Sequence, residues 1–170
     1  KVYYKVETKD YIPLIHKFKI KKTWAKELVA TAKKAGAKYI TLTTRHHDGF
    51  SLYDTCGLNE YDAPHALAGR DLIREFVNEC RKADIVPHFY HTTLDWWHPD
   101  FENNFEAYLE YLYKSVESLC TKYGKIGGLW FDGNWSKPDA DWKEGELYAT
   151  IRRHQPEAMI INNTGLSERG

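Results

Sequence analysis

The sequence predicts an α/β fold, a (β/α)8 TIM-barrel-like catalytic domain of which this chain covers roughly half, or about four βα units. Strand patterns and helix patterns alternate along the chain, which implies a parallel sheet with helical crossovers. The expected helix-to-strand connections are short, whereas the strand-to-helix connections are long. Long loops at the carboxyl ends of parallel strands form one face, which is where such barrels place their active sites.

A doubly wound open sheet is the alternative, because it also binds ligands at the carboxyl ends of its strands. Its phosphate-binding version needs a glycine fingerprint after the first strand, whereas residues 45–49 are Arg-His-His-Asp-Gly. The barrel is therefore favoured. A complete barrel takes eight strands and about 250 residues. We therefore interpret residues 1–170 as a single, incomplete domain whose remainder belongs to a longer parent chain or to a partner.

Composition argues against several classes of protein. The 24 basic and 24 acidic residues balance, so nothing predicts binding to nucleic acid or to a membrane surface. No apolar run approaches the roughly 20 residues of a membrane span. Cys56, Cys80 and Cys120 are too sparse for a disulfide framework or a zinc knuckle. Six tryptophans and twelve tyrosines indicate either core packing or carbohydrate binding, because flat rings pack against sugar C–H faces.

The first elements become clear after residue 22. Before it, a strand at residues 2–6 and a short amphipathic segment at 11–18 are the only candidates. A helix starts after Thr23, its expected cap, and keeps apolar residues such as Leu28 at helical spacing. The β-branched run at residues 37–44 then predicts a strand.

The middle of the chain repeats this alternation. A helix is expected at residues 71–83, with its first residue as the N-cap, and a strand at 85–92, where Pro87 removes one ladder donor. Residues 105–123 form the clearest helix, because their apolar positions alternate steps of four and three.

The last third contains two more strands. Residues 127–132 form a short apolar strand, residues 142–154 a helix that Pro156 stops, and residues 158–163 the fourth strand. No repeat or linker interrupts the pattern, so we expect one domain.

The strand at residues 127–132 ends in a lone carboxylate, Asp132, followed by Gly133. Side chains alternate along a strand, so Trp130 and Asp132 share one face. A carboxylate beside an aromatic residue is expensive to bury without a purpose. The alternative is that Asp132 only caps the next turn, since Asp-Gly is a common turn pair.

Two adjacent histidines, His46 and His47, follow the strand at residues 37–44. On an extended backbone they would point in opposite directions, so we expect them not to share a metal. A neutral imidazole has one donor and one acceptor, which suits vicinal hydroxyls. The alternative is a pair of solvated loop histidines without a role.

A third motif covers the strand at residues 85–92 and the loop after it. His88 and Tyr90 have the same parity and are expected to point inward. His88 and His91 face opposite ways on a strand, so they do not form a metal site. Trp96 and Trp97 lie on the loop, where exposed indoles are unexpected unless they touch a ligand or a partner.

Residues 35–50 and 130–133, with segments 69–72 and 90–96 between them, resemble glycoside hydrolase family 29, the α-L-fucosidases. The resemblance extends over about residues 24–163. It implies a retaining exo-acting α-L-fucosidase with a (β/α)-barrel-like domain, no metal and no other cofactor. It also implies a fucosylated oligosaccharide or glycoconjugate as substrate, and a secreted, periplasmic or lysosomal location.

The resemblance assigns roles to individual residues. Asp132 matches the family nucleophile, which must be ionised and needs hydrogen-bond donors that neighbouring imidazoles can supply. The expected substrate-binding residues are His46, His47, Tyr90 and Trp130, together with the loop indole of Trp96.

Two features of the sequence depart from the family pattern, and the catalytic acid/base of the family has no match in the chain. The family's first-strand motif Phe-Ile-His-Trp-Gly is not recognisable in residues 1–22, and Thr164 stands where the family often has arginine. The family's acid/base is a glutamate on a later loop, so we expect it beyond Gly170. We expect Asp48 to cap its own loop. The other carboxyl candidates for the acid/base within the chain are Asp95, Glu144, Glu146 and Glu168.

Two other functions remain open at this point. One is a catalytically inactive, sugar-binding relative, in which Asp132 lacks a partner. The other is a barrel glycosidase for another neutral or deoxy sugar. Sequons begin at Asn134 and Asn162, close to the proposed active face, and we interpret them as chance matches.

Overall fold

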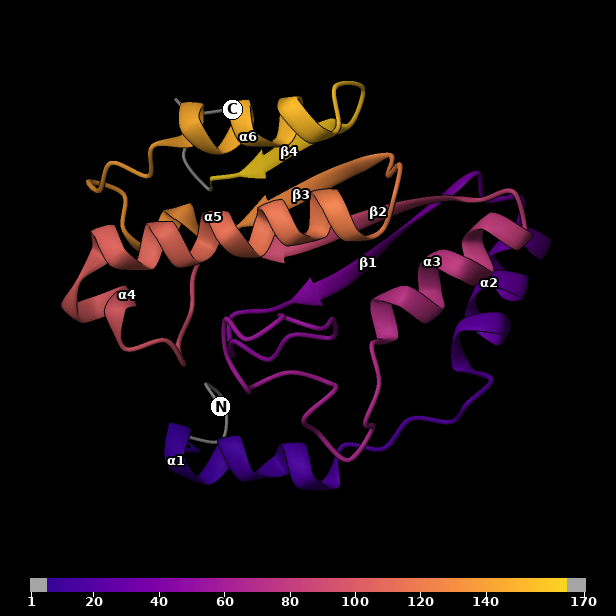
Figure 1. The fold of residues 1–170 in the computed structure, drawn as a ribbon, viewed down its shortest axis with the longest axis horizontal. Coiled ribbons are helices and arrows are strands. Elements are labelled where there is room, and N and C mark those ends of the chain that lie inside the picture. The colour runs from indigo at the N-terminus through magenta and orange to yellow at the C-terminus, as the bar shows by residue number, and fades with distance from the viewer. Residues whose placement is uncertain (1–5, 165–170) are drawn as a thin grey trace.

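The computed structural model describes residues 6–164. The candidate strand at residues 2–6 lies outside this range except for its last residue, and so does Glu168. Figure 1 shows the order of the elements along the chain. They are α1 (Thr8–Tyr11), η1 (Ile12–Lys17), α2 (Trp24–Lys34), β1 (Tyr39–Arg45), α3 (Leu72–Lys82), β2 (Val86–Thr92), α4 (Asp100–Asn103), α5 (Phe105–Lys122), β3 (Gly128–Asp132), η2 (Asn134–Ser136), α6 (Glu144–His154) and β4 (Met159–Asn163).

The four strands form one parallel sheet in the order β1-β2-β3-β4, which confirms the predicted βα alternation (Figure 1). Such an order, with each strand beside its sequence neighbour, is that of consecutive units of a (β/α) barrel. Pro87 lies near the start of β2, where its carbonyl still accepts a hydrogen bond from the N–H of Gly127 at 2.9 Å. The ladder therefore tolerates the missing donor.

Helices cover one face of the sheet. The alternate side chains Phe89, Leu129 and Phe131 are at most 2% exposed and belong to the same core cluster as the apolar stripes of α3, α5 and α6. Each fully buried side chain of this size contributes about 1.5–3 kcal/mol of hydrophobic free energy. Because this helix layer packs against one face of the sheet, the carboxyl ends of the strands keep fixed positions relative to one another.

The opposite face of the sheet is open. By strand parity and register it carries the side chains of Tyr39, Val86, Trp130, Met159 and Ile161, which are 40–60% exposed. These residues are apolar or aromatic, and they stand on the face that also carries Tyr90 and Asp132. The open face is thus the one that would line a barrel interior.

Some local expectations were wrong. Thr23 does not cap α2 through its side chain; its hydroxyl donates to Glu27 instead, at 2.6 Å. Leu28 is 38% exposed and lies outside the apolar stripe. The helix expected from residue 142 starts at Glu144, and Trp142 is buried before it begins.

The expected N-cap of α3 was confirmed. Asp71 caps α3 by accepting a hydrogen bond from the N–H of Arg74 at 2.8 Å. The three cysteines are free, with Cys80 and Cys120 buried. Within residues 6–164, no helix combines the length and the hydropathy that a membrane crossing requires.

Candidate active site

The candidate site lies at the carboxyl ends of the four strands β1 to β4. The register places Asp132 between Thr92 on one neighbouring strand and Asn163 on the other. Tyr90 lies beside Trp130 one layer deeper on the same face, so its hydroxyl reaches up to Asp132. Parity therefore brings Tyr90, Trp130 and Asp132 together, as the sequence predicted.

Three side-chain donors hold the carboxylate of Asp132, which is 18% exposed. Its Oδ2 accepts from the Tyr90 hydroxyl at 2.9 Å. Its Oδ1 accepts from Trp135 Nε1 at 3.0 Å and from Asn163 Nδ2 at 3.2 Å. All three are side chains, so the carboxylate is not committed to capping the backbone of its own turn.

Tyr90 is a donor that keeps its proton. Burial, followed by the hydrogen bond to Asp132 and the charge of that carboxylate, raises the pKa of Tyr90 well above its ordinary value. At neutral pH its hydroxyl therefore donates to Asp132.

Gly133 lets the chain turn directly after Asp132. Its φ is +131°, and a Cβ there would lie 2.5 Å from the backbone nitrogen of Leu94. Only glycine allows this close approach between the loops that follow β2 and β3.

His47 lies against Asp132 but does not form an ion pair with it. Its Nε2 is 3.7 Å from Asp132 Oδ2, too far for a hydrogen bond. Burial, aided by His46, lowers the pKa of His47 more than the carboxylates raise it, so the ring is neutral at pH 7. The expectation that imidazoles supply the donors to Asp132 was therefore wrong. The donors are a phenol, an indole and an amide.

The hydrogen bonds assign the tautomer of His47. Its Nδ1 is 2.7 Å from Thr92 Oγ1, and that hydroxyl donates its one proton to the carbonyl of Leu94 at 2.6 Å. The close contact to His47 therefore requires Nδ1 to carry the proton. This leaves Nε2 as a lone-pair acceptor that faces the region of Asp132.

His46 has the complementary tautomer in its neutral form. Its Nδ1 accepts a hydrogen bond from the backbone N–H of His47 at 2.8 Å, so the ring proton is on Nε2. The ring is exposed and stacks on Tyr90, with centroids 5.4 Å apart and an interplanar angle of 14°. The pair thus offers one donor and one acceptor.

The two histidines do not point in opposite directions, contrary to the parity expectation. Their ring centroids are 4.2 Å apart. The reason is that β1 ends at Arg45, and a turn closed by the bond from Gly49 N–H to the His46 carbonyl follows. Parity arguments hold only within the strand.

Aromatic side chains surround His47. Its ring meets the edges of Trp96 and Trp135 at centroid distances of 5.5 and 5.7 Å. These two indoles and Trp130 are 37–42% exposed, so their rings are accessible to a ligand or to further polypeptide chain. Trp97 differs: it stacks on Tyr61 at 5.4 Å and serves packing.

Sequence reasoning did not select Trp135, Asn163 or Thr92 as site residues. Trp135 lies two residues after the Asp-Gly pair, and Asn163 lies at the tip of the fourth strand, so the sequence pattern could have indicated both. Thr92 carried none, because its role depends on the contact with His47.

The other carboxyl groups serve the loops. Asp48 Oδ1 accepts from Phe50 N–H at 3.3 Å, which confirms its expected capping role, and its Oδ2 accepts from Tyr11 at 3.1 Å. The Asp95 side chain is completely buried. Glu144 accepts a hydrogen bond from Asn134 at 3.0 Å. Among residues 6–164, no three His, Cys, Asp or Glu side chains gather as a metal site would require.

The amide of Asn134 is buried and hydrogen-bonded through both its oxygen and its nitrogen. The residue is 1% exposed, its Oδ1 accepts from Thr93 at 2.7 Å, and its Nδ2 donates to Glu144. A glycan cannot reach this nitrogen, which agrees with the sequon at Asn134 being a chance match.

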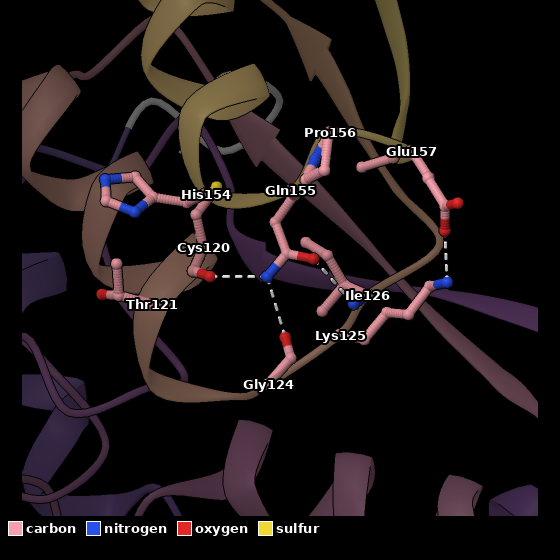
Figure 2. Close-up of a pocket in the computed structure, with 10 residues that line it drawn as sticks. Cys120, Thr121, Gly124, Lys125, Ile126, His154, Gln155, Pro156 and Glu157 are labelled. Carbon is pink, nitrogen blue, oxygen red and sulfur yellow. Dashed lines mark hydrogen bonds and ion pairs between the residues drawn. The ribbon is translucent and has the colours of Figure 1, made fainter.

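A cavity of about 490 Å³ lies at the other end of the sheet, between the end of α5, the end of α6 and the starts of β3 and β4. Figure 2 shows the Gln155 amide in the middle of its wall, donating to the carbonyls of Cys120 and Gly124 at 2.6 and 2.9 Å. Its Oε1 accepts from the Ile126 N–H at 3.2 Å. The polar groups of Gln155 and of the neighbouring backbone thus hydrogen-bond to one another. We therefore interpret the cavity as part of the packing between α5, α6 and the sheet, and not as a binding site.

Comparison with known proteins agrees with this geometry. The sequence model described as Alpha-L-fucosidase matches residues 1–170. The tissue α-L-fucosidase of Bos taurus is 30% identical over 140 residues, which are 77% of this chain and 30% of that protein. The tissue enzyme of Mus musculus is 31% identical over 137 residues, with the chain again covering 30% of it.

Solved structures show the same relationship. The α-L-fucosidase isoenzyme 1 of Paenibacillus thiaminolyticus superimposes with a TM-score of 0.83 and 34% identity, over 93% of this chain and 42% of that one. A family 29 α-L-fucosidase of Bacteroides thetaiotaomicron, trapped as a covalent intermediate with 2-fluoro-fucosyl fluoride, gives a TM-score of 0.86 and 25% identity, over 97% and 43%. The chain thus spans 30–43% of the length of these four relatives.

Proposed function

The chain belongs to the α-L-fucosidase family, and from that premise we propose that it supplies the nucleophile half of a retaining, exo-acting α-L-fucosidase. The substrate is a fucosylated oligosaccharide or glycoconjugate with a terminal α-L-fucosyl group. The observation that carries the proposal is the position of Asp132 at the tip of β3, where its carboxylate accepts hydrogen bonds from three neutral side chains.

In the proposed reaction, a carboxylate oxygen of Asp132 attacks the anomeric carbon of fucose. The bond from that carbon to the aglycone oxygen breaks, and a second carboxyl group protonates the leaving oxygen. The same group then removes a proton from water, which displaces Asp132 and releases fucose. Net retention follows from the two displacements.

Sugar recognition uses the ring nitrogens of the histidine pair. His46 donates from Nε2 and His47 accepts at Nε2, so together they can bind two neighbouring hydroxyls. The exposed indole faces of Trp96 and Trp130 suit the C–H bonds of the sugar and its methyl group.

The acid/base is proposed to come from outside the described residues. A retaining site needs a second carboxyl about 5 Å from the first. Asp48 and Glu144 are engaged in loop contacts, and Asp95 is completely buried. Thr164 is 5% exposed and lacks the charge of the arginine that the family often has there.

We propose that further strands of the same catalytic domain cover the open sheet face. Tyr39, Val86 and Met159 are 60%, 47% and 55% exposed, which is unusual for large apolar side chains that share one face of a sheet. A barrel completed by more chain would bury them. We also infer from the family that the protein acts in a secreted, periplasmic or lysosomal setting.

A chromogenic α-L-fucoside tests the activity in the full-length protein. Turnover that disappears in Asp132→Ala supports the proposal. Fucose binding without turnover would point to an inactive, sugar-binding relative, and turnover of another glycoside alone would point to a different barrel glycosidase.

A further inference from the structure

Two buried charges beside the site have no part in the proposed reaction. Arg45 ends β1, and Asp95 lies in the loop after β2, and both side chains are 0% exposed. Arg45 Nη1 and Asp95 Oδ2 are 3.9 Å apart, and neither atom has a hydrogen-bond partner among the described residues. Burying a charge is unfavourable unless its surroundings compensate for lost water. Such a pair therefore calls for an explanation.

The other donors of Arg45 bind it to two parts of the chain, the loop after β1 and helix α5. Its Nε donates to Ser51 at 3.0 Å, and its Nη2 donates to Tyr53 at 2.6 Å and to Ser115 on α5 at 2.8 Å. The guanidinium also lies over the ring of Tyr111, 4.8 Å from its centroid. Arg45 is thus fixed against the helix layer.

Asp95 shapes the loop that follows β2. Its Oδ1 accepts from the backbone N–H groups of Trp97 at 2.7 Å and His98 at 2.9 Å. Burial raises the pKa of Asp95, while the charge of Arg45 and these two donors act to lower it.

The two loops touch directly at the site. The N–H of Trp96 donates to the carbonyl of His47 at 2.8 Å. Gly49 has φ of +81°, and a Cβ on it would lie 2.6 Å from Asp95 Oδ1. In the sequence, each buried charged residue directly precedes a site residue: Arg45 precedes His46, and Asp95 precedes Trp96.

We propose that Arg45 and Asp95 are a positioning pair that holds the histidine loop and the Trp96 loop in one fixed arrangement. The pair touches neither the sugar nor the reacting atoms. It acts through His47 and Trp96, and its kinetic consequence rests on the proposed fucosidase activity.

Arg45→Met in the full-length protein tests the proposal. The remaining Asp95 can take up a proton, so no bare charge is left buried. We expect kcat/KM for a chromogenic fucoside to fall on the order of 10- to 100-fold, mainly through kcat, because small misplacements of binding groups have effects of this size. The imidazole ¹⁵N signals of His47 should shift in the free protein as well. Arg70→Met, which removes an ion pair with Glu75 away from the site, is the matched control and should change neither.

The outcomes separate this proposal from the proposed function. Unchanged kinetics and unchanged His47 signals in Arg45→Met would overturn the positioning role. If the wild-type protein shows no fucoside turnover but the His47 signals still shift, the activity is refuted and the positioning role stands. If Arg45→Met does not fold, the double variant Arg45→Met/Asp95→Asn, which leaves no unpaired charge, carries the same two readouts and the same criteria.

Discussion

Replacing His47 by asparagine should lower fucoside turnover more than replacing it by glutamine. The asparagine amide occupies the place of Nδ1 and can keep the bond to Thr92, but it offers nothing at the place of Nε2. The glutamine amide reaches the place of Nε2 and can present an acceptor oxygen there. His47 is 7% exposed, and its Nε2 is 3.7 Å from Asp132 Oδ2, so a sugar hydroxyl bound there is shielded from water.

The size of the effect follows from that shielding. A buried hydroxyl left without its partner costs about 1–3 kcal/mol. At 1.36 kcal/mol per factor of ten, His47→Asn should lose roughly 5- to 150-fold in kcat/KM. His47→Gln loses only the neutral bond to Thr92, about 1 kcal/mol. The assay is the initial rate on a chromogenic α-L-fucoside, with thermal unfolding as the control for folding. An asparagine variant as active as the glutamine variant would refute the assignment of Nε2 as the nitrogen of His47 that contacts the sugar.

Three further predictions follow. Because burial lowers the pKa of His47 below 6.5, its Nε2 acceptor persists above that pKa and is lost as pH falls through it; the pH profile of kcat/KM should show this acid limb, and His47→Gln should lack it. Gly133→Ala should destabilise the fold by about 1–3 kcal/mol in denaturant unfolding because of its φ of +131°. Gly145→Ala, which meets nothing within 4 Å in a helix, should stabilise it by up to about 1 kcal/mol, and equal effects would contradict the argument. Met159→Asp should destabilise the full-length protein by at least about 2 kcal/mol, whereas Leu67→Asp, with a similar exposure of 51% against 55%, should not; equal losses would mean that the sheet face stays uncovered.

Periodicity accounts for most of what could be predicted about the fold. The apolar steps of α5 and the β-branched run of β1 are signals within one element, so the sequence alone contains them. Strand parity likewise placed Trp130 and Asp132 of β3 on one face of the sheet, and it placed Tyr90 of the neighbouring strand β2 on the same face.

Periodicity and parity within one element could not predict the contacts that side chains make between different elements. Asn163 reaches Asp132 only because the register aligns the tips of β3 and β4, and no local pattern fixes that register. Thr92 acts through the path of the loop that carries His47. The two histidine rings lie together because β1 ends before them, and a strand's end is uncertain by a residue or two in any pattern analysis.

The identity of the nucleophile is the central claim, and covalent labelling tests it most directly. The full-length protein is incubated with 2-fluoro-fucosyl fluoride, digested, and its peptides analysed by mass spectrometry. We predict that a fluorofucosyl ester, formed as fluoride leaves, maps to Asp132 and that Asp132→Asn is not labelled. A label on any other carboxylate, or turnover that survives in Asp132→Asn, would contradict the account.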